Sequence, residues 1–177
     1  IIPTYNRCET LRRTLDLYAL QQDVKGRFEV ILGDDGSSDG TLKMLEAIET
    51  ISTYPLHYIS LATNSGPSAA RNKAIALAKG SILLFAGDDI LPSPRFVAEH
   101  LEWHATRHPE PHVGVLGYAK WAPELQVTPF MHWLEQNGTQ FAYGRITHGE
   151  SIDCGLLHTS NVSFKTDFIR GNNELFD

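Results

Sequence analysis

Two adjacent carboxylates, Asp88 and Asp89, follow an apolar run at residues 82–86. Carboxylates at the end of a buried run are costly unless a cation or a hydrogen-bond donor meets them. A hard divalent cation such as Mg2+ or Mn2+ is the natural partner, because it takes few protein carboxylates and completes its shell with water and phosphate oxygens. The pair therefore predicts a metal that faces a phosphate group. The structural alternative is an acidic turn ahead of Pro92.

A second polar segment, residues 34–41 (DDGSSDGT), is denser in carboxylates and glycines. Ser38 or Asp39 is expected to cap the next helix by accepting a backbone N–H. Capping does not explain Asp34 and Asp35 together. A carboxylate at this point could accept the N–H of a uracil or a ribose hydroxyl, and the glycines permit a ligand to approach the backbone closely.

A third segment, residues 64–73 (NSGPSAARNK), opens a predicted helix. The amino end of a helix favours anions, and Arg71 and Lys73 add positive charge. The segment therefore fits a phosphate-facing helix start. Taken alone, it fits a well-capped surface helix with solvated basic residues better.

Apolar periodicity predicts the elements that position these segments. Helices are expected where apolar residues recur every three or four positions, over residues 9–22, 39–50, 67–79, 92–108 and 126–136, with a further turn from Thr166. Strands are expected over short apolar runs, at residues 1–2, 28–32, 56–61, 82–86, 113–118 and 162–165. Strands that alternate with helices indicate an α/β domain with a parallel sheet.

Four polar loops follow successive strands of this predicted sheet, at residues 3–7 (PTYNR), 34–39, 64–67 and 87–89. In open α/β sheets, ligands bind at the carboxyl ends of the strands. The four loops are therefore expected to converge on one edge and to form one binding site.

Composition narrows the classes of partner. The chain has 177 residues, which suits one domain, and a formal net charge of -6, which argues against nucleic acid as a main partner. Its two cysteines, Cys8 and Cys154, are too few for a disulfide framework and fit a reduced cytosol. No apolar run approaches the roughly 20 residues that a membrane span needs. The abrupt ends at Ile1 and Asp177 suggest a domain truncated at both ends, so an anchor outside the chain stays open.

Taken together, the motifs resemble those of the family 2 glycosyltransferases, enzymes of the GT-A fold. The resemblance is carried by residues 2–7 (IPTYNR), 34–41, 64–72 (NSGPSAARN) and 80–91 (GSILLFAGDDIL). It covers residues 1–118 strongly and residues 159–177 moderately. It implies a Rossmann-like, three-layer α/β/α sandwich with a mostly parallel central sheet. Residues 1–118 would bind the nucleotide sugar, and residues 119–177 would begin the acceptor-side half.

The resemblance also implies roles by position. The nucleotide-sugar-binding residues would be Pro3, Tyr5, Asp35, Asn64, Arg71 and Asp88. Tyr5 would lie against the base with Pro3 beside it, Asp35 would bind the base, and Asp89 would hold the metal, Mg2+ or Mn2+. One departure concerns position 87, where many members carry the first acid of an Asp-x-Asp motif and this chain has glycine. The departure weakens the ribose contact more than the metal assignment.

The resemblance implies a metal-dependent, inverting transfer from a nucleotide-diphosphate donor, a UDP-sugar by preference, to a glycan, lipid or other hydroxyl acceptor. Such enzymes build polysaccharides and surface glycans, so a cytoplasmic location is expected, including the inner face of the membrane. The catalytic base belongs to a Glu-Asp motif that this sequence lacks, and it is expected beyond Asp177. The alternatives are a non-catalytic nucleotide- or glycan-binding module and a sugar-nucleotide nucleotidyltransferase, although residues 3–7 do not form the Gly-rich basic loop typical of the latter.

Two further groups of residues invite a functional interpretation. His100, His104 and His108 share a helix face, as zinc ligands do, but their charged neighbours favour a solvated face. Four aromatic residues could form acceptor platforms, because sugars stack on aromatic rings, although such rings more often pack in a core or at a domain edge; the candidates are Trp103, Trp121, Phe130 and Trp133.

Overall fold

The computed structural model describes residues 1–24, 26–137, 141–171 and 176. Six strands form in chain order: β1 (Ile2–Thr4), β2 (Val30–Asp34), β3 (Leu56–Ser60), β4 (Ile82–Ala86), β5 (Val115–Leu116) and β6 (Asn161–Lys165). The helices are α1 (Cys8–Tyr18), α2 (Thr41–Glu49), α3 (Pro67–Leu77), α4 (Phe96–Glu102), α5 (Pro129–Gln136) and α6 (Thr166–Gly171). A π-helix, Trp103–Arg107, continues α4, and two 3-10 turns lie at Tyr143–Arg145 and Cys154–Leu156.

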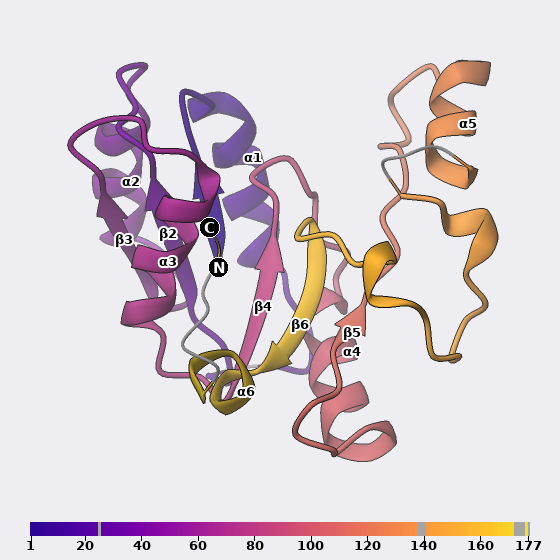
Figure 1. The fold of residues 1–177 in the computed structure, drawn as a ribbon. Coiled ribbons are helices and arrows are strands. Elements are labelled where there is room, and N and C mark those ends of the chain that lie inside the picture. The colour runs from indigo at the N-terminus through magenta and orange to yellow at the C-terminus, as the bar shows by residue number, and fades with distance from the viewer. Residues whose placement is uncertain (25, 138–140, 172–175, 177) are drawn as a thin grey trace.

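The strands form one mostly parallel sheet. Strands β1, β2 and β3 pair in parallel, in the order β1-β2-β3. Ile1 joins β1 to β4, because its amine donates to the Leu84 carbonyl at 2.7 Å and its carbonyl accepts from the Ala86 N–H at 3.1 Å. This is the bonding pattern of a parallel pair. Beyond β4, strand β6 runs antiparallel between β4 and β5. The spatial order is therefore β3-β2-β1-β4-β6-β5 (Figure 1).

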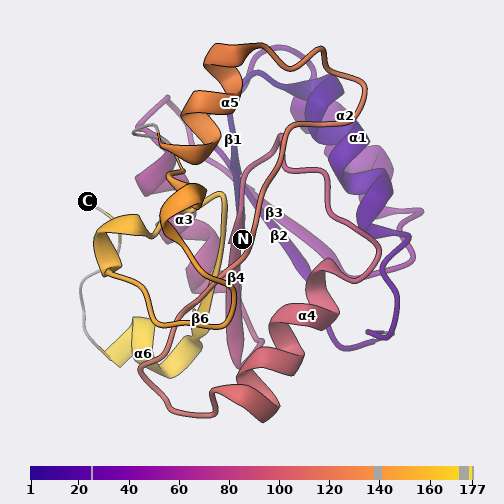
Figure 2. The ribbon, with the colours of Figure 1, turned by 90° about the vertical axis from the view of Figure 1, so that its right-hand side faces the viewer.

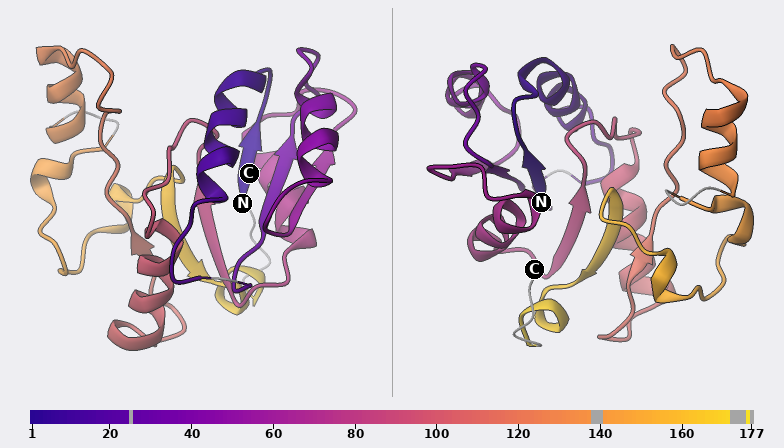
Figure 3. Two further views of the ribbon diagram at one scale, coloured as in Figure 1. Left: turned by 180° about the vertical axis from the view of Figure 1, so that it is seen from behind. Right: turned by 45° about the horizontal axis from the view of Figure 1, so that its top comes forward.

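Helices cover both faces of this sheet, as the views from the front and from behind show (Figures 1 and 3). Alternate residues of β2 point to opposite faces, so that Val30 and Leu32 enter one core and Ile31 enters the other. The first core is completed by α1, α2 and α4, and the second by α3. The predicted three-layer α/β/α sandwich is confirmed.

Helix α3 approaches the sheet most closely at Gly33 of β2. A Cβ atom on Gly33 would overlap the carbonyl oxygen of Ala70 and would lie 2.6 Å from its carbonyl carbon. Ala70 and Ala74 are fully buried at this contact. Small residues on both sides thus set the position of α3, whose amino end faces the edge where the polar loops lie.

The elements stand where periodicity predicts them, but several ends differ. The predicted helix at 92–108 begins only at Phe96, because a residue that precedes a proline disfavours the helical conformation and Pro94 is the last of two prolines here. The predicted strand at 113–118 shrinks to two residues. Gly114 and Gly117 flank these, and a Cβ on Gly117 would overlap the side-chain amide of Asn161.

Beyond β5 the chain leaves the sheet and returns to it through β6. Helix α5 stands in this excursion, to one side of the sheet (Figures 1 and 2). Its Phe130 and Trp133 rings stack at a centroid distance of 5.9 Å and are 65% and 49% exposed. In the part of the chain that the structure describes, none of the helices is long and apolar enough to cross a membrane.

Candidate functional site

Asp35 joins the loop after β2 to the loop that opens α3. Its Oδ1 accepts the N–H of Ser65 at 2.7 Å, and its Oδ2 accepts the N–H of Gly66 at 2.8 Å. The Asp35 backbone N–H also donates to the Thr4 carbonyl at 2.9 Å. The carboxylate is 3% exposed, and each of its oxygens keeps a lone pair for a further donor. Asp35 therefore connects the two loops and can also accept a hydrogen bond from a ligand at the predicted site.

Asp34 has a structural role. It is fully buried, accepts the Ser60 hydroxyl at 2.7 Å, and is also bonded by the N–H of Ser37. These bonds close the turn after β2 and tie it to β3. Of the two carboxylates that the sequence places together, only Asp35 stands at the loop that opens α3.

The loop after β1 is fixed to the loop after β2 on both sides of Arg7. The Asn6 side-chain oxygen accepts the N–H of Ser38 at 2.7 Å, and the Cys8 N–H donates to Asp39 Oδ2 at 2.9 Å. Asn6 holds a left-handed backbone, with φ of 51°, a conformation that asparagine tolerates better than most residues.

Asp39 satisfies the first amide of two helices. Besides the Cys8 N–H at the start of α1, it accepts the N–H and the hydroxyl of Thr41, the first residue of α2, at 3.1 and 2.6 Å. The capping role predicted for Ser38 or Asp39 falls to Asp39, acting from the position before Gly40. Partial burial raises the pKa of Asp39, but these hydrogen bonds outweigh it and the net pKa is lowered.

Asp88 is buried at the end of β4 and is oriented by two threonines. Its Oδ2 accepts the Thr4 hydroxyl at 2.8 Å, and its backbone carbonyl accepts the Thr14 hydroxyl at 2.8 Å. Burial raises the pKa of Asp88, and the Thr4 hydrogen bond and the charge of Arg7 oppose that rise. The bond to Thr4 leaves Oδ1 of Asp88 free to face a cation.

Arg7 shows that the paired carboxylates converge on a single positive charge. Its Nη1 atom lies 2.9 Å from Asp89 Oδ2 and 3.6 Å from Asp88 Oδ1. Two carboxylate oxygens that face one cation are a donor set that Mg2+ or Mn2+ accepts when water and phosphate oxygens complete the shell. The residues therefore fit a divalent metal.

Gly87, which stands where an Asp-x-Asp motif has its first acid, leaves room for the Asp89 carboxylate. A Cβ on Gly87 would lie 2.8 Å from Asp89 Oδ1 and 3.2 Å from the Ile90 side chain. The Asp89 carboxylate thus folds back over Gly87, and a larger residue at this position would displace it.

The other predicted residues divide into two groups. Pro3 is buried and Tyr5 is 45% exposed on the loop after β1, and Asn64 is exposed directly before the amides that Asp35 binds. Pro3 lies in β1 itself, and the other residues, together with Asp35, Asp88 and Asp89, lie on loops at the carboxyl edge of the sheet. Arg71 lies further along α3, with its guanidinium carbon 5.5 Å from the Phe176 ring centroid.

Arg71 has an unusual environment. Its Nε atom is buried and has no hydrogen-bond partner among the described residues, and burial lowers the pKa of its guanidinium. An unpaired buried donor is costly, and a ligand acceptor could satisfy it.

Sequence reasoning placed Thr4, Asn6 and Arg7 in a loop of the site but gave them no individual role, and it missed Thr14. Thr14 gives a usable signal, because it is a polar residue next to Leu15 on the apolar face of α1. The contacts of Thr4 and Arg7 reach residues more than 80 positions away, and local pattern does not show them.

The prediction that the three histidines form a solvated face is wrong for two of them. His100 and His104 are only 5% and 3% exposed, while His108 is half-buried. Strand β6 covers this side of α4 and supplies Ser163 to both buried rings. Among the residues that the structure describes, no group of three His, Cys, Asp or Glu side chains is placed to hold a metal ion.

The buried rings belong to a continuous chain of hydrogen bonds with both imidazoles neutral. The Lys165 ammonium donates to His104 Nδ1 at 3.3 Å, and His104 Nε2 donates to the Ser163 oxygen at 2.9 Å. The Ser163 hydroxyl donates to His100 Nδ1 at 2.7 Å, and His100 Nε2 donates to Asn161 Oδ1 at 2.8 Å. Each group thus has one consistent donor or acceptor role.

Asn161 carries this chain to the carboxyl edge. It pairs with Ala86, the last residue of β4, and its side-chain amide donates to the Tyr118 carbonyl at 3.2 Å. Tyr118 is 59% exposed, and its hydroxyl donates to the buried Glu135 of α5. The buried polar chain therefore fixes the segment after β5 beside the loop that carries Asp88.

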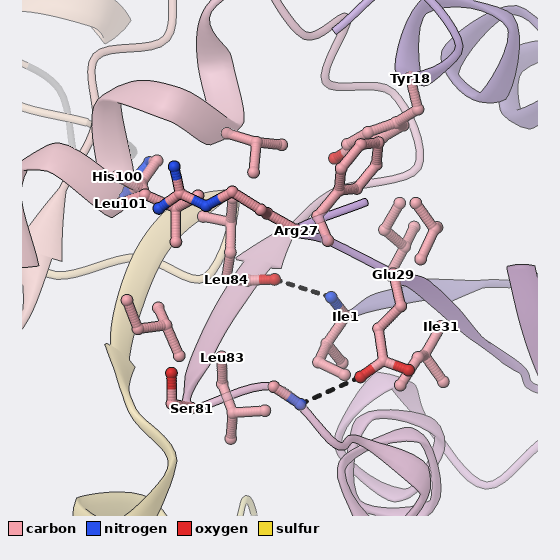
Figure 4. A pocket seen from close by; sticks show the side chains of 16 residues that line it. Ile1, Tyr18, Arg27, Glu29, Ile31, Ser81, Leu83, Leu84, His100 and Leu101 are labelled. Carbon is pink, nitrogen blue, oxygen red and sulfur yellow. Dashed lines mark hydrogen bonds between the residues drawn. The ribbon is translucent and has the colours of Figure 1, made fainter. Parts of the chain in front are cut away.

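A separate cavity of about 120 Å³ lies at the opposite end of the sheet. Ile1, Val30, Leu83 and Leu84 line it, and the Ile1 backbone nitrogen and Glu29 are polar groups in its wall (Figure 4). The cavity opens between the amino-terminal halves of β2 and β4, so it is distinct from the candidate site at the carboxyl ends.

The fold and its loops match proteins of known class. An uncharacterized glycosyltransferase of Bacillus subtilis, YfnE, is 41% identical over 104 residues, which cover 59% of this chain and 26% of the relative. Among solved structures, the UDP complex of TarS from S. aureus matches with a TM-score of 0.75 and 25% identity, over 100% of this chain and 49% of that one. A mannosyltransferase of Pyrobaculum calidifontis, in complex with GDP-Man and Mn2+, matches in fold with a TM-score of 0.70 and 23% identity, over 99% of this chain and 46% of that one.

The chain spans about a quarter of the length of the first curated relatives that it matches. The structural neighbours confirm the GT-A fold that the motifs imply. The model of the family described as Glycosyl transferase family 2 matches residues 1–155. A match over this share of the sequence, with the four loops gathered at one edge of a GT-A sheet, shows that the chain belongs to glycosyl transferase family 2.

Proposed function

We propose that this chain binds a UDP-sugar together with Mg2+ or Mn2+ and is the donor-binding part of an inverting glycosyltransferase. The convergence of Asp88 Oδ1 and Asp89 Oδ2 on one cation carries the proposal. Residues 1–118 bind the nucleotide sugar, and residues 119–177 begin the acceptor-side half. The acceptor is a hydroxyl of a glycan, a lipid or another molecule in glycan biosynthesis.

The loops around the carboxylates supply a nucleotide pocket. Tyr5, beside Pro3, offers an exposed ring for the base, and Asp35 offers lone pairs for a base N–H. Asn64 lies next to these acceptors, and the Nε of Arg71 is a buried donor without a partner among the described residues. The preference for uracil is supported by the UDP complex of the TarS structure, which shares the fold over the whole chain.

The protein residues prepare the site for departure of the diphosphate. The Thr4 hydroxyl holds Asp88 in one orientation, and Asp89 stands half-exposed beside it. When bound, the metal would neutralise charge that develops on the leaving diphosphate. Asp89 would hold the metal, and Asp88 would lie beside it, toward the ribose or the sugar.

Inversion requires a base that removes the proton of the acceptor hydroxyl as this oxygen attacks opposite the leaving group. Neither Asp153 nor Asp167 is proposed for this role, because the base is expected from residues that follow Asp177. The segment from Tyr118 to α5 stands on the acceptor side, where Glu135 fixes the Tyr118 hydroxyl.

Asp89→Ala is expected to weaken UDP binding in the presence of Mn2+ by tenfold or more, on the order of 1.4 kcal/mol. The reason is that the substitution removes the more exposed of the two metal-facing carboxylates. Calorimetric titration of UDP, with and without Mn2+, compares the variant with the wild type in four conditions.

Asp16→Ala is the matched control, because Asp16 is an exposed carboxylate on α1 that pairs with Arg12. It should bind UDP as the wild type does. Equal binding in all four wild-type and Asp89→Ala conditions would rule out the metal-diphosphate site. Metal-dependent UDP binding by a protein that transfers no sugar would instead favour a non-catalytic binding module.

A further inference from the structure

Arg7 is presented to the paired carboxylates by a backbone that is fixed on both sides. Asn6 is bonded to Ser37 and Ser38, through its N–H at 2.9 Å and its side-chain oxygen at 2.7 Å. Cys8 is bonded to Asp39. The Arg7 side chain reaches from the loop after β1 to the loop after β4.

The carboxylates need a positive charge whether or not a metal is bound. Asp88 is buried, and the adjacent charge of Asp89 makes its ionised form still less favourable. The guanidinium of Arg7 supplies that charge from 2.9 Å at Asp89 and 3.6 Å at Asp88. Its Nη1 thus faces the same two oxygens that would face a divalent cation.

We propose that Arg7 is an exchangeable counter-cation, which competes with the divalent metal for Asp88 and Asp89 and moves onto the diphosphate when the metal binds. This inference rests on the proposed function. It makes metal and nucleotide bind cooperatively, because metal alone leaves Arg7 next to a new positive charge. A diphosphate that arrives with the metal gives the displaced guanidinium a new anionic partner.

The exposure of the pair makes the exchange easy. The side chains of Arg7 and Asp89 are 50% and 55% exposed, and ion pairs at such positions are weak. Asp88 keeps its bond from Thr4 during the exchange, because that bond uses Oδ2. The carboxylates can therefore change cation without moving.

The test measures binding of Mn2+ alone, by the electron paramagnetic resonance signal of the free ion, in low salt. Arg7→Gln is expected to bind Mn2+ about three- to tenfold more tightly than the wild type, since a competing charge is removed. Added salt should shrink this gain because it screens exposed charges. Saturating UDP should raise Mn2+ affinity in the wild type by a larger factor than in Arg7→Gln, because only in the wild type does the diphosphate draw a competing guanidinium away from the carboxylates. Mn2+ should raise UDP affinity by the same factor, since the coupling between two ligands is reciprocal.

Two further variants complete the design. Arg7→Lys keeps the charge and should stay within about twofold of the wild type. Arg13→Gln removes an equally exposed arginine of α1, which pairs with Glu124 and not with the carboxylates, and should change nothing. Mn2+ binding to Arg7→Gln that equals the wild type, or is weaker, overturns the role of Arg7 while the metal site stands. A wild type that binds neither Mn2+ nor UDP overturns the proposed function, and the inference with it.

Discussion

Gly33→Ala is expected to lower the free energy of unfolding by about 3 kcal/mol, the upper range for forcing extra atoms into a packed core. The new Cβ would overlap the Ala70 carbonyl oxygen, and backbone on both sides leaves no flexible side chain to yield. Helix α3 must therefore shift away from β2. Urea denaturation followed by circular dichroism measures the loss.

The same shift should weaken nucleotide binding. Helix α3 begins directly after Ser65 and Gly66, whose amides bind the Asp35 carboxylate at 2.7 and 2.8 Å. Displacement of the helix pulls these amides from Asp35, so UDP affinity should fall at temperatures where the variant is still folded.

Gly171→Ala is the matched control, because a Cβ on Gly171 would have no described residue within 4 Å apart from its chain neighbours and the backbone of its own helix. Its unfolding free energy should stay within about 0.5 kcal/mol of the wild type, as is usual for surface substitutions. If Gly33→Ala behaved like this control, the close approach of α3 would not determine the stability of the fold.

The layout of this fold is readable from the sequence because its local patterns and its packing agree. The apolar run 82–86 becomes β4 without a change of bounds, and the helix predicted from Pro67 begins at that residue. The local pattern of apolar residues does not determine the order of the strands in the sheet. Strand β6 enters the sheet between β4 and β5, and the pairing of Ile82 with Lys165 joins residues that are 83 positions apart.

Part of the candidate site can likewise be predicted from the sequence, and part cannot. The positions of Asp35, Asp88 and Asp89 at strand ends follow from the predicted sheet, because the carboxyl ends of parallel strands share an edge. The different roles of Asp34 and Asp35 do not follow, since both are acids at the end of one strand. Only the packing of β3 shows that Asp34 is enclosed with Ser60.

The histidines of α4 show the limit of inference from neighbours in sequence. Glu99 and Glu102 are exposed, as their charge suggests, but they stand on another side of the helix from His100. The partner of His100 and His104 is Ser163, about 60 residues further along the chain. One serine of β6 that hydrogen-bonds two histidine rings of a packed helix leaves no periodic pattern in the sequence of either element.

The burial of these imidazoles leads to a second large effect, a loss of stability in acid. Burial lowers the pKa of His100 to about 4 from its ordinary value of 6.5, and it also lowers the pKa of His104. The neighbouring His104 also disfavours a positive charge on His100, and Lys165 disfavours one on His104. Asn161 and Glu99 favour the charged form of His100, but less strongly than burial disfavours it. The unfolded chain therefore binds a proton at His100 more readily than the folded chain does.

The sign of the effect follows from this difference. Stability from the neutral His100 is fully present above about pH 6.5 and is lost as the pH falls toward 4, up to about 3 kcal/mol. Protonation also breaks the hydrogen-bond chain, because His100 Nδ1 would become a donor and could no longer accept the Ser163 hydroxyl. Urea denaturation at a series of pH values between 4 and 7 measures the slope.

His100→Gln removes the titrating ring and should flatten this slope, although the variant is less stable than the wild type at pH 7. His112→Gln, at an exposed position outside the hydrogen-bond chain, should keep the wild-type slope. Comparison of slopes cancels the contribution of carboxylates that titrate in the same range, such as Asp88 with its raised pKa. Equal slopes in the wild type and His100→Gln would mean that the buried chain between α4 and β6 does not depend on a neutral imidazole.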